Sequence, residues 1–221
     1  MVVLAIDTSA AIAVAVVSGD AALARLCVDE RRRHAEQLAP MLQQVLVDAG
    51  IKREDLIGVV VGTGPAPFTG LRAGLVTARS FAFALGIPVW GVPSIDALAA
   101  QAVVDLNLGA GAELLVVTDA RRREVYWARY RAVVGVEPEL LEGPAVGKSA
   151  ELQLSPVIVG EGAQLYPDDL PLTPGAPLLP DPVMLARCAA ARLAAGRDLF
   201  TEPLYLRRPD VHEPTRTVGA R

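Results

Sequence analysis

A glycine- and proline-rich loop near the middle of the sequence sets the strongest limit on the fold. It joins an apolar segment, Leu56 to Val61, to a segment from Gly70 to Gly86 whose apolar residues recur at helical spacing. The first segment has the length of a buried parallel strand, and Thr69 stands where a helix N-cap is expected. Strand, glycine loop and helix in this order can form an anion cradle, with the helix N-terminus directed at the ligand.

Two residues of this loop weaken the prediction of a phosphate site. Pro67 has no N–H to donate, and Ala66 adopts positive φ less readily than glycine does. A loop that only turns the strand into the helix is therefore the alternative. Gly64 in this loop remains a candidate phosphate contact.

The N-terminal segment predicts three strands joined by two tight turns. Strands are expected over residues 2–6, 11–17 and 22–28, which gives an antiparallel unit with a polar tip at Asp7, Thr8 and Ser9. A carboxylate and two hydroxyls at such a tip could meet a phosphate or a bound Mg²⁺. The alternative is that these residues only form the turn.

The rest of the chain predicts an α/β protein of two subdomains, residues 1–108 and 109–221. Helices are expected over 34–49, 70–86 and 94–106, strands over 56–61 and 87–91, and a linker at 107–111. A second unit then repeats strand, Asp-containing turn and strand over 114–134, and a short strand at 157–159 ends in glycines. We take Asp119, Gly160 and Gly162 as candidate ligand contacts. Residues 167–182 form a proline-rich loop, Asp181 caps a helix to Gly196, and the tail is expected to fray.

Composition and charge limit the function. The net charge is −4, and a chain that grips nucleic acid unaided usually has a basic balance, so we expect weak tRNA binding by the chain alone. Cys27 and Cys188 are predicted to be reduced core residues. No basic leader and no long uncharged apolar run are present, so we expect a soluble, cytoplasmic protein. The arginines at 31–33 and 121–123 are predicted to be solvated; the alternative places 121–123 beside a cleft or a tRNA path.

A row of small residues, Gly70, Gly74 and Ala78, lies along the helix that follows the glycine loop. Such a row lets another helix approach closely, and we expect it to face a partner protein. The predicted partner face joins this helix to the preceding one and comprises Leu38, Met41, Leu42, Gly70, Leu71, Gly74, Leu75 and Ala78. The alternative is that the row packs on the chain's own sheet.

Several motifs resemble those of the actin, sugar kinase and Hsp70 ATPase (ASKHA) superfamily, and within it those of the bacterial TsaB (YeaZ) family. They are LAIDTS at 4–9, HAEQLAP at 34–40, GTGPAPFTGLRAG at 62–74, DARRREVY at 119–126 and PLYLR at 203–207. The resemblance implies an actin-like fold of two ribonuclease H-like subdomains, the second reduced. Family members usually carry Gly-Ser where this chain has Ala66-Pro67.

The resemblance also implies a function in forming threonylcarbamoyladenosine in tRNAs that read codons beginning with A. The chain would be a non-catalytic scaffold that pairs with a TsaD-like catalytic subunit, together with a TsaE-like ATPase, and would meet tRNA only within that complex. Because an apolar partner face left bare would be covered by a second copy, we also expect a homodimer when the chain is alone. It would require no cofactor, although weak binding of ATP or ADP is compatible with the fold. The alternative is an active small-molecule kinase, with Asp119 the nearest candidate for a general base.

A metal site is not expected. TsaD-type relatives hold a metal with two histidines four residues apart on a helix, and Ser94 and Leu98 stand at the matching positions here. Neither is a strong metal ligand. The two histidines, His34 and His212, are far apart in the sequence, with no second His or Cys beside either.

Overall fold

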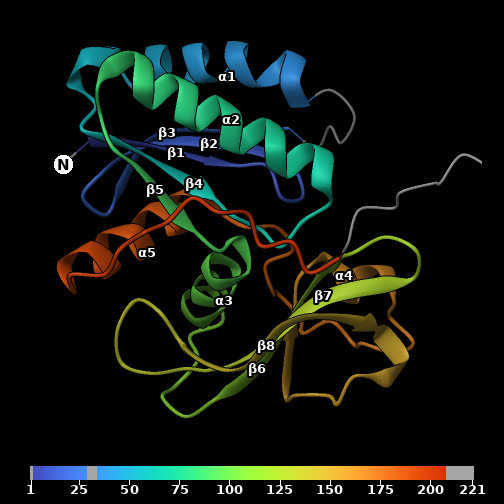
Figure 1. Ribbon diagram of the computed structural model, residues 1–221. Coiled ribbons are helices and arrows are strands. Elements are labelled where there is room, and N and C mark those ends of the chain that lie inside the picture. The colour runs from blue at the N-terminus through green and yellow to red at the C-terminus, as the bar shows by residue number, and fades with distance from the viewer. Residues whose placement is uncertain (1, 29–33, 208–221) are drawn as a thin grey trace, which may run out of the picture.

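The computed structural model describes residues 2–28 and 34–207, which form two lobes, each built on one β-sheet (Figure 1). The first sheet has the strand order β3-β2-β1-β4-β5. Its strands are β1 (Val2–Asp7), β2 (Ile12–Ser18), β3 (Ala21–Val28), β4 (Gly58–Gly62) and β5 (Val89–Val92). The first three strands are antiparallel, whereas β4 runs parallel to β1 and β5 parallel to β4.

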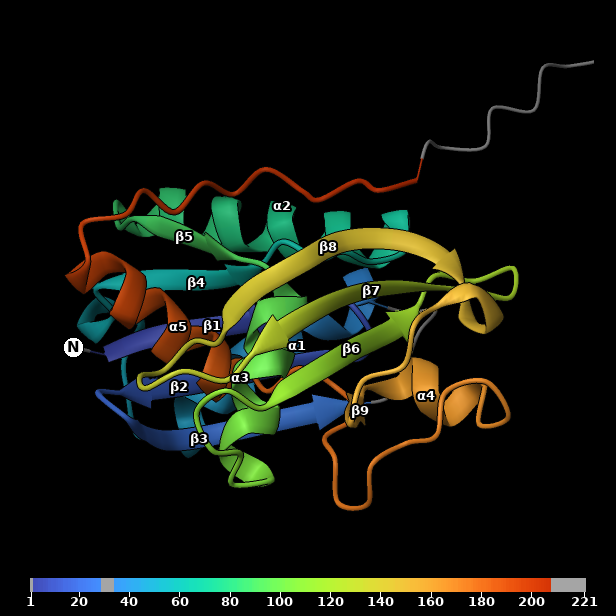
Figure 2. The same ribbon diagram turned by 90° about the horizontal axis from the view of Figure 1, so that it is seen from below.

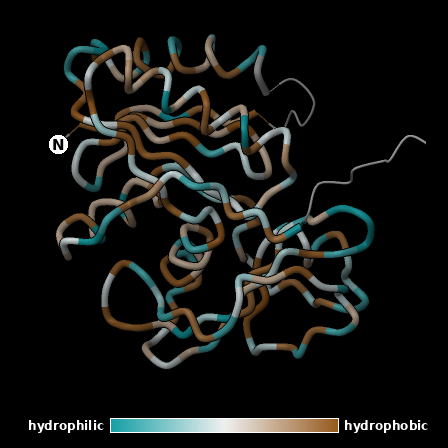
Figure 3. Tube along the Cα trace, in the orientation of Figure 1, coloured by the Kyte–Doolittle hydropathy of each residue, from teal (hydrophilic) through white to brown (hydrophobic). Residues whose placement is uncertain are grey.

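Helices cover both faces of the first sheet because its central strands are apolar on both sides. One face packs against α1 (His34–Asp48) and α2 (Phe68–Leu85). The other packs against α3 (Ser94–Asp105) and α5 (Pro182–Ala194). A short 3-10 helix, Arg53–Asp55, leads into β4. Figure 3 shows the apolar residues concentrated along the strands between these helices.

The second sheet repeats the first four strands of the first sheet. It comprises β6 (Glu113–Asp119), β7 (Glu124–Arg131), β8 (Glu139–Lys148) and β9 (Val157–Val159), in the order β8-β7-β6-β9. Here β6, β7 and β8 are antiparallel and β9 runs parallel to β6. This duplication confirms the predicted actin-like α/β fold. The second lobe is the reduced one, because its sheet has four strands and the helix after β9, α4 (Glu161–Leu165), has five residues.

The chain returns to the first lobe after a loop that follows α4. Helix α5 packs on the first sheet, and residues 197–207, which we call the strap, run along β5 and α2 toward β7 (Figure 2). Hydrogen bonds hold the strap: Gly91 N–H donates to Leu199 O at 3.2 Å, and Leu204 N–H donates to Thr63 O at 2.9 Å. The predicted division at residue 108 stays a prediction; the structure places α5 and the strap beside the first sheet.

Several local predictions need correction. Helix α2 begins at Phe68 with Pro67 as its N-cap, so Thr69 lies inside the helix. Ser94 is likewise the first residue of α3, and its hydroxyl bonds to Asp7. Cys27 is exposed on the edge strand β3, whereas Cys188 is buried as predicted. The Asp181 cap is confirmed, since its carboxylate accepts the Val183 N–H at 2.8 Å.

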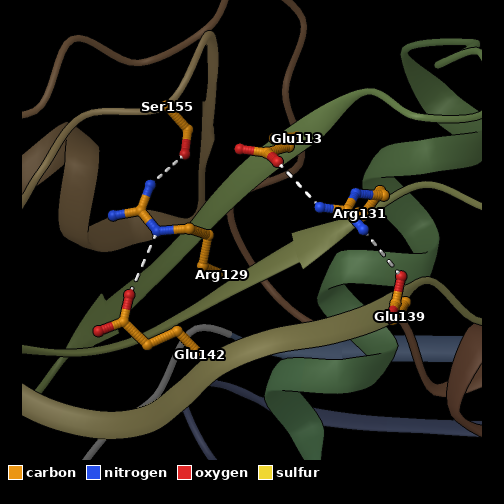
Figure 4. A network of polar contacts seen from close by, with 6 residues as sticks. All are labelled: Glu113, Arg129, Arg131, Glu139, Glu142 and Ser155. Atoms are coloured by element: carbon orange, nitrogen blue, oxygen red, sulfur yellow. Dashed lines mark hydrogen bonds and ion pairs between the residues drawn. The ribbon is translucent and has the colours of Figure 1, made fainter.

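Strand β8 was not expected, since it contains Gly143 and Pro144, which disfavour strand interiors. Arginines of β7 contact it and neighbouring segments on the outer face of the second sheet (Figure 4). Arg129 lies 3.5 Å from Glu142 and donates to the Ser155 hydroxyl at 2.6 Å. Arg131 contacts Glu113 and Glu139 at 3.3 and 3.4 Å. Residues 149–151 form a short 3-10 helix after β8.

Among the residues that the structure describes, no helix is both long and apolar enough to cross a membrane.

Candidate functional site

The carboxylate of Asp7 is the centre of a buried hydrogen-bond network where β1, β4 and α3 meet. Its Oδ1 accepts the backbone N–H and the hydroxyl of Ser9 at 2.8 and 2.6 Å, and its Oδ2 accepts the Ser94 hydroxyl at 2.5 Å. Gly62 leaves room for this carboxylate, because a Cβ there would lie 2.0 Å from Oδ2. Asp7 is 1% exposed, so both of its oxygens are used within the fold.

Thr8 and Ser9, unlike Asp7, lie beside a cavity. The Thr8 hydroxyl donates to Gly70 O at 2.9 Å and ties β1 to α2. Both residues line a small cavity of about 200 Å³, together with Ala10, Pro67, Thr69, Gly70 and Arg121. The structure therefore brings Thr8 and Ser9, and not Asp7, to the wall of a space that a ligand could enter. Their role as phosphate contacts stays a prediction.

Burial raises the pKa of Asp7 above its ordinary value of 3.8, against the lowering effect of the hydrogen bonds from Ser9 and Ser94. The native state therefore binds this proton more tightly than the unfolded chain does. The stability that Asp7 contributes is fully present below the unfolded pKa and is lost as the pH rises through the folded pKa.

Asp7→Asn is expected to remove this pH dependence, because an amide does not ionise while its oxygen still accepts the Ser9 donors. Denaturant unfolding between about pH 4 and pH 8 should show the stability gap between wild type and variant narrowing as the pH rises. Asp7→Ala is the control. Alanine cannot ionise either, so its gap to wild type should narrow in parallel. It also leaves the Ser9 and Ser94 donors without an acceptor, so it should be about 1–3 kcal/mol less stable than Asp7→Asn throughout. A gap for Asp7→Asn that does not change with pH would contradict the assignment.

The candidate residues of the second lobe lie around the end of β6. Asp119 is 8% exposed; its Oδ1 accepts the Arg121 N–H at 2.7 Å and its Oδ2 lies 3.2 Å from the Arg121 guanidinium. Gly160, at φ +99°, and Gly162 both press against the Val117 backbone, where a Cβ would lie 2.1 Å and 3.0 Å from its atoms. These glycines therefore let α4 pack on β6. Gly64, at φ +89°, is buried and donates its N–H to the Ser94 hydroxyl at 3.3 Å.

A cleft of about 390 Å³ lies between the lobes. Its lining combines small, aromatic and cationic residues: Ala66, Pro67, Phe68, Ala120, Arg121, Arg122, Tyr126, Tyr205, Leu206 and Arg207. Three contacts fix its walls. Tyr126 donates to Ala66 O at 3.4 Å across the lobes, and Arg207 donates to Ala120 O at 2.9 Å and pairs with Glu124.

The turn between β6 and β7 has an unusual backbone. Arg121, Arg122 and Arg123, the arginine turn, all adopt left-handed conformations, with φ of 62°, 55° and 62°. Residues with a Cβ pay roughly 1–2 kcal/mol each for this region. All three are exposed, so the prediction of solvated arginines is confirmed. Arg121 and Arg122 also line the cleft, as the alternative stated, whereas a tRNA path beside the turn stays a prediction.

The side chains predicted for the partner face lie in the core of the first lobe, although one of them, Leu42, also lines a groove between α1 and α2. Gly70 and Gly74 are buried, and the six others are at most 8% exposed. A Cβ at Gly74 would lie 2.2 Å from the Thr8 Oγ1 atom. The small-residue row thus packs on the chain's own strands, which is the alternative stated for it.

The solvent side of α1 and α2 carries a different set of apolar residues. Val47, Val76 and Phe83 are 68%, 61% and 89% exposed. Beside them a groove of about 740 Å³ lies between the helices, lined by Ala39, Leu42, Gln43, Leu46, Val47, Ile51, Arg53, Val76, Thr77, Ser80 and Phe81. The sequence analysis predicted this pair of helices as the partner surface but, apart from Leu42, named other residues of it. Val76 and Phe83 interrupt the polar side of the helical pattern and could have indicated the solvent side.

The absence of a metal site stays a prediction. Within residues 2–28 and 34–207, no three His, Cys, Asp or Glu side chains are grouped as metal ligands. Leu98 is in the core, and the Ser94 hydroxyl is bound to Asp7. His212 and the arginines at 31–33 lie outside the described residues, and the His34 side chain is not described.

Comparisons with known proteins agree on one family. The profile of the family "TsaD: tRNA N6-adenosine threonylcarbamoyltransferase" matches residues 29–166. The chain is 43% identical to an uncharacterized protein of Mycobacterium tuberculosis over 84% of this chain and 80% of that protein. It is 33% identical to the tRNA threonylcarbamoyladenosine biosynthesis protein TsaB of Escherichia coli over 62% and 61% of the two chains. The solved structure of YeaZ from Pseudomonas aeruginosa matches with a TM-score of 0.78 and 30% identity, covering 93% of this chain and 99% of that one.

Proposed function

Because the chain belongs to the TsaB (YeaZ) family of tRNA threonylcarbamoyladenosine biosynthesis, we propose that it is the non-catalytic partner of a TsaD-like subunit. With a TsaE-like ATPase, the complex would form N6-threonylcarbamoyladenosine at position 37 of tRNAs that read codons beginning with A. The chain would act in the cytoplasm and meet tRNA within that complex.

The observation that carries this proposal is the uncovered groove between α1 and α2. Its lining is mostly apolar and includes Val47 and Val76, which the chain itself leaves exposed, as it does Phe83 on α2. Apolar surface of this kind on a folded chain marks an interaction site. A relative with the same fold would present a matching pair of helices, so a TsaD-like subunit is the occupant that we propose. Without that subunit, a second copy of this chain would cover the groove, which gives the homodimer.

The state of the carboxylates supports a non-catalytic role. A kinase of this fold needs an accessible carboxylate as general base. Asp7 is buried and hydrogen-bonded to Ser9 and Ser94, and Asp119 lies against Arg121. Activity as a small-molecule kinase is therefore the weaker alternative.

Reconstitution tests the function. Chain, TsaD-like subunit and TsaE-like ATPase together should convert tRNA, threonine, bicarbonate and ATP to threonylcarbamoyladenosine, and omitting the chain should abolish the product. The chain alone should form none. Product from the chain alone, or full activity without it, would refute the proposal. Calorimetry with ATP should show at most weak binding; tight binding with turnover would favour the kinase.

Val76→Asp is expected to weaken pairing with the TsaD-like subunit by about 30-fold or more, because it places a charge in a desolvated contact. The melting temperature of the isolated chain should change little, since Val76 is 61% exposed. Val134→Asp is the matched control: Val134 is 96% exposed on the second lobe, and its variant should pair normally. Equal affinities of Val76→Asp and wild type would place the interface elsewhere.

A further inference from the structure

Arginines gather beside the interlobe cleft, although the chain as a whole has a net charge of −4. Arg121, Arg122 and Arg207 line the cleft, and Arg72 lies at its margin against Phe68 and Tyr205. Within residues 2–28 and 34–207, Asp119 contacts Arg121 and Glu124 pairs with Arg207. The region is therefore a local basic surface that the overall charge conceals.

The arginine turn concentrates this charge. Three consecutive left-handed residues are unusual, and glycine or asparagine adopts that conformation more readily than arginine does. The turn holds three exposed guanidinium groups within three residues at the edge of the cleft. Guanidinium groups bind phosphate oxygens through paired hydrogen bonds, which makes such a turn suited to a polyphosphate backbone.

Aromatic rings line the same cleft. The Phe68 and Tyr205 rings are 5.1 Å apart, and the Arg72 guanidinium stacks 3.5 Å from the Phe68 ring centre and donates to the Tyr205 hydroxyl at 2.9 Å. We call these three residues the aromatic cluster. Tyr205 is 41% exposed and Phe68 36% exposed, so ring surface is accessible for stacking on a base.

We propose that the arginine turn and the aromatic cluster form a contact surface for a single-stranded segment of RNA. Phosphates would bind to Arg122 and Arg123, and an unpaired base would stack on Tyr205. A duplex fits less well, because its bases are already stacked and cannot reach the rings. The inference rests on the proposed function, since it assigns to this chain part of the contact with the tRNA of the complex.

The first test uses Arg122→Asn/Arg123→Asn, because asparagine tolerates left-handed φ and removes both charges. The full chain is titrated with a fluorescent single-stranded RNA at several salt concentrations, and the reconstituted complex with tRNA likewise. Losing two phosphate contacts should weaken binding about 10- to 30-fold at 0.15 M salt and reduce the slope of log K against log salt by about 1.4 for the single-stranded RNA. The control, Arg131→Gln/Arg197→Asn, removes the same charge elsewhere and should change neither quantity substantially.

The second test separates stacking from phosphate contact. Tyr205→Leu should weaken binding about 10-fold while leaving the salt slope unchanged, because stacking releases no counterions. An RNA duplex or inorganic phosphate should compete poorly with the single strand. Equal competition by inorganic phosphate would overturn the RNA assignment in favour of a simple anion site.

RNA binding by the isolated chain and activity of the reconstituted complex together distinguish the inference from the proposed function. If the isolated chain loses RNA affinity in the arginine and tyrosine variants while the complex is inactive, the inference stands and the proposed function fails. In the opposite case the complex is active with the wild-type chain. If the arginine and tyrosine variants then bind RNA as tightly as the control, both as isolated chains and within the complex, the inference is overturned and the proposed function stands.

Discussion

Replacing Arg192 with methionine is expected to lower the free energy of unfolding by about 3–5 kcal/mol. The Arg192 guanidinium on α5 lies 2.7 Å from the Asp96 carboxylate of α3 and 2.6 Å from that of Glu137. The three side chains are only 15–18% exposed. Without the arginine, two partly buried carboxylates would remain without their cation, which is the costly way to break such a network.

The pKa values reflect the same network. Burial lowers the pKa of Arg192, but the hydrogen bonds to Glu137 and Asp96 outweigh it and raise the pKa overall. Tyr130 donates to Asp96 at 2.6 Å, and its pKa is well above the ordinary value because of burial and the nearby Asp96 charge. The network joins both lobes, since Asp96 and Arg192 lie on helices of the first sheet and Tyr130 lies on β7.

Urea unfolding measures the effect of Arg192→Met. Arg187→Met on the same helix is the matched control, because the Arg187 partner, Asp20, is 91% exposed, and such pairs contribute about 1 kcal/mol or less. Arg192→Met/Glu137→Leu should recover part of the loss by replacing a charged contact with an apolar one. Equal losses for Arg192→Met and Arg187→Met would mean that water screens the network.

Gly74→Leu should lower the free energy of unfolding of the isolated chain by about 2–4 kcal/mol. A Cβ at this position would lie 2.2 Å from the Thr8 Oγ1 atom, so the larger side chain must displace Thr8. Overpacking costs about 1–3 kcal/mol, and losing the Thr8–Gly70 hydrogen bond adds about 0.5–1.5 kcal/mol.

Thermal melting of the lone chain and size exclusion with the TsaD-like subunit measure this prediction. Ala84→Leu adds the same side chain at an exposed position of α2 and should melt near the wild-type temperature. A Gly74→Leu variant that keeps its melting temperature but does not bind the TsaD-like subunit would show that the small-residue row faces the partner and not the core.

Much of the first lobe could be predicted from the sequence. The apolar run at 2–6 is a strand, the run at 56–61 contains most of β4, the glycine loop does precede a helix, and Asp181 caps α5. These features depend on local spacing and turn chemistry, which neighbouring residues determine. The repeat of strand, Asp-containing turn and strand likewise indicated the second lobe. Strand β8 was not predicted, because its stability comes from pairing with β7 and not from its own residues.

The role of each candidate residue was decided by tertiary structure. Helical spacing predicts that Gly70, Gly74 and Ala78 share one face of α2. Spacing alone does not determine whether this face packs on a partner protein or on the chain's own sheet. The position of Thr8 beside Gly74 shows that the chain itself covers this face. Asp7 lies at a turn of a kind that often contacts ligands. In the structure, its Oδ2 atom instead accepts a hydrogen bond from the hydroxyl of Ser94, 87 residues away. A sequence determines which side chains share a face or a turn. Which partner meets that face depends on contacts between distant segments, which exist only after the sheets and helices have packed.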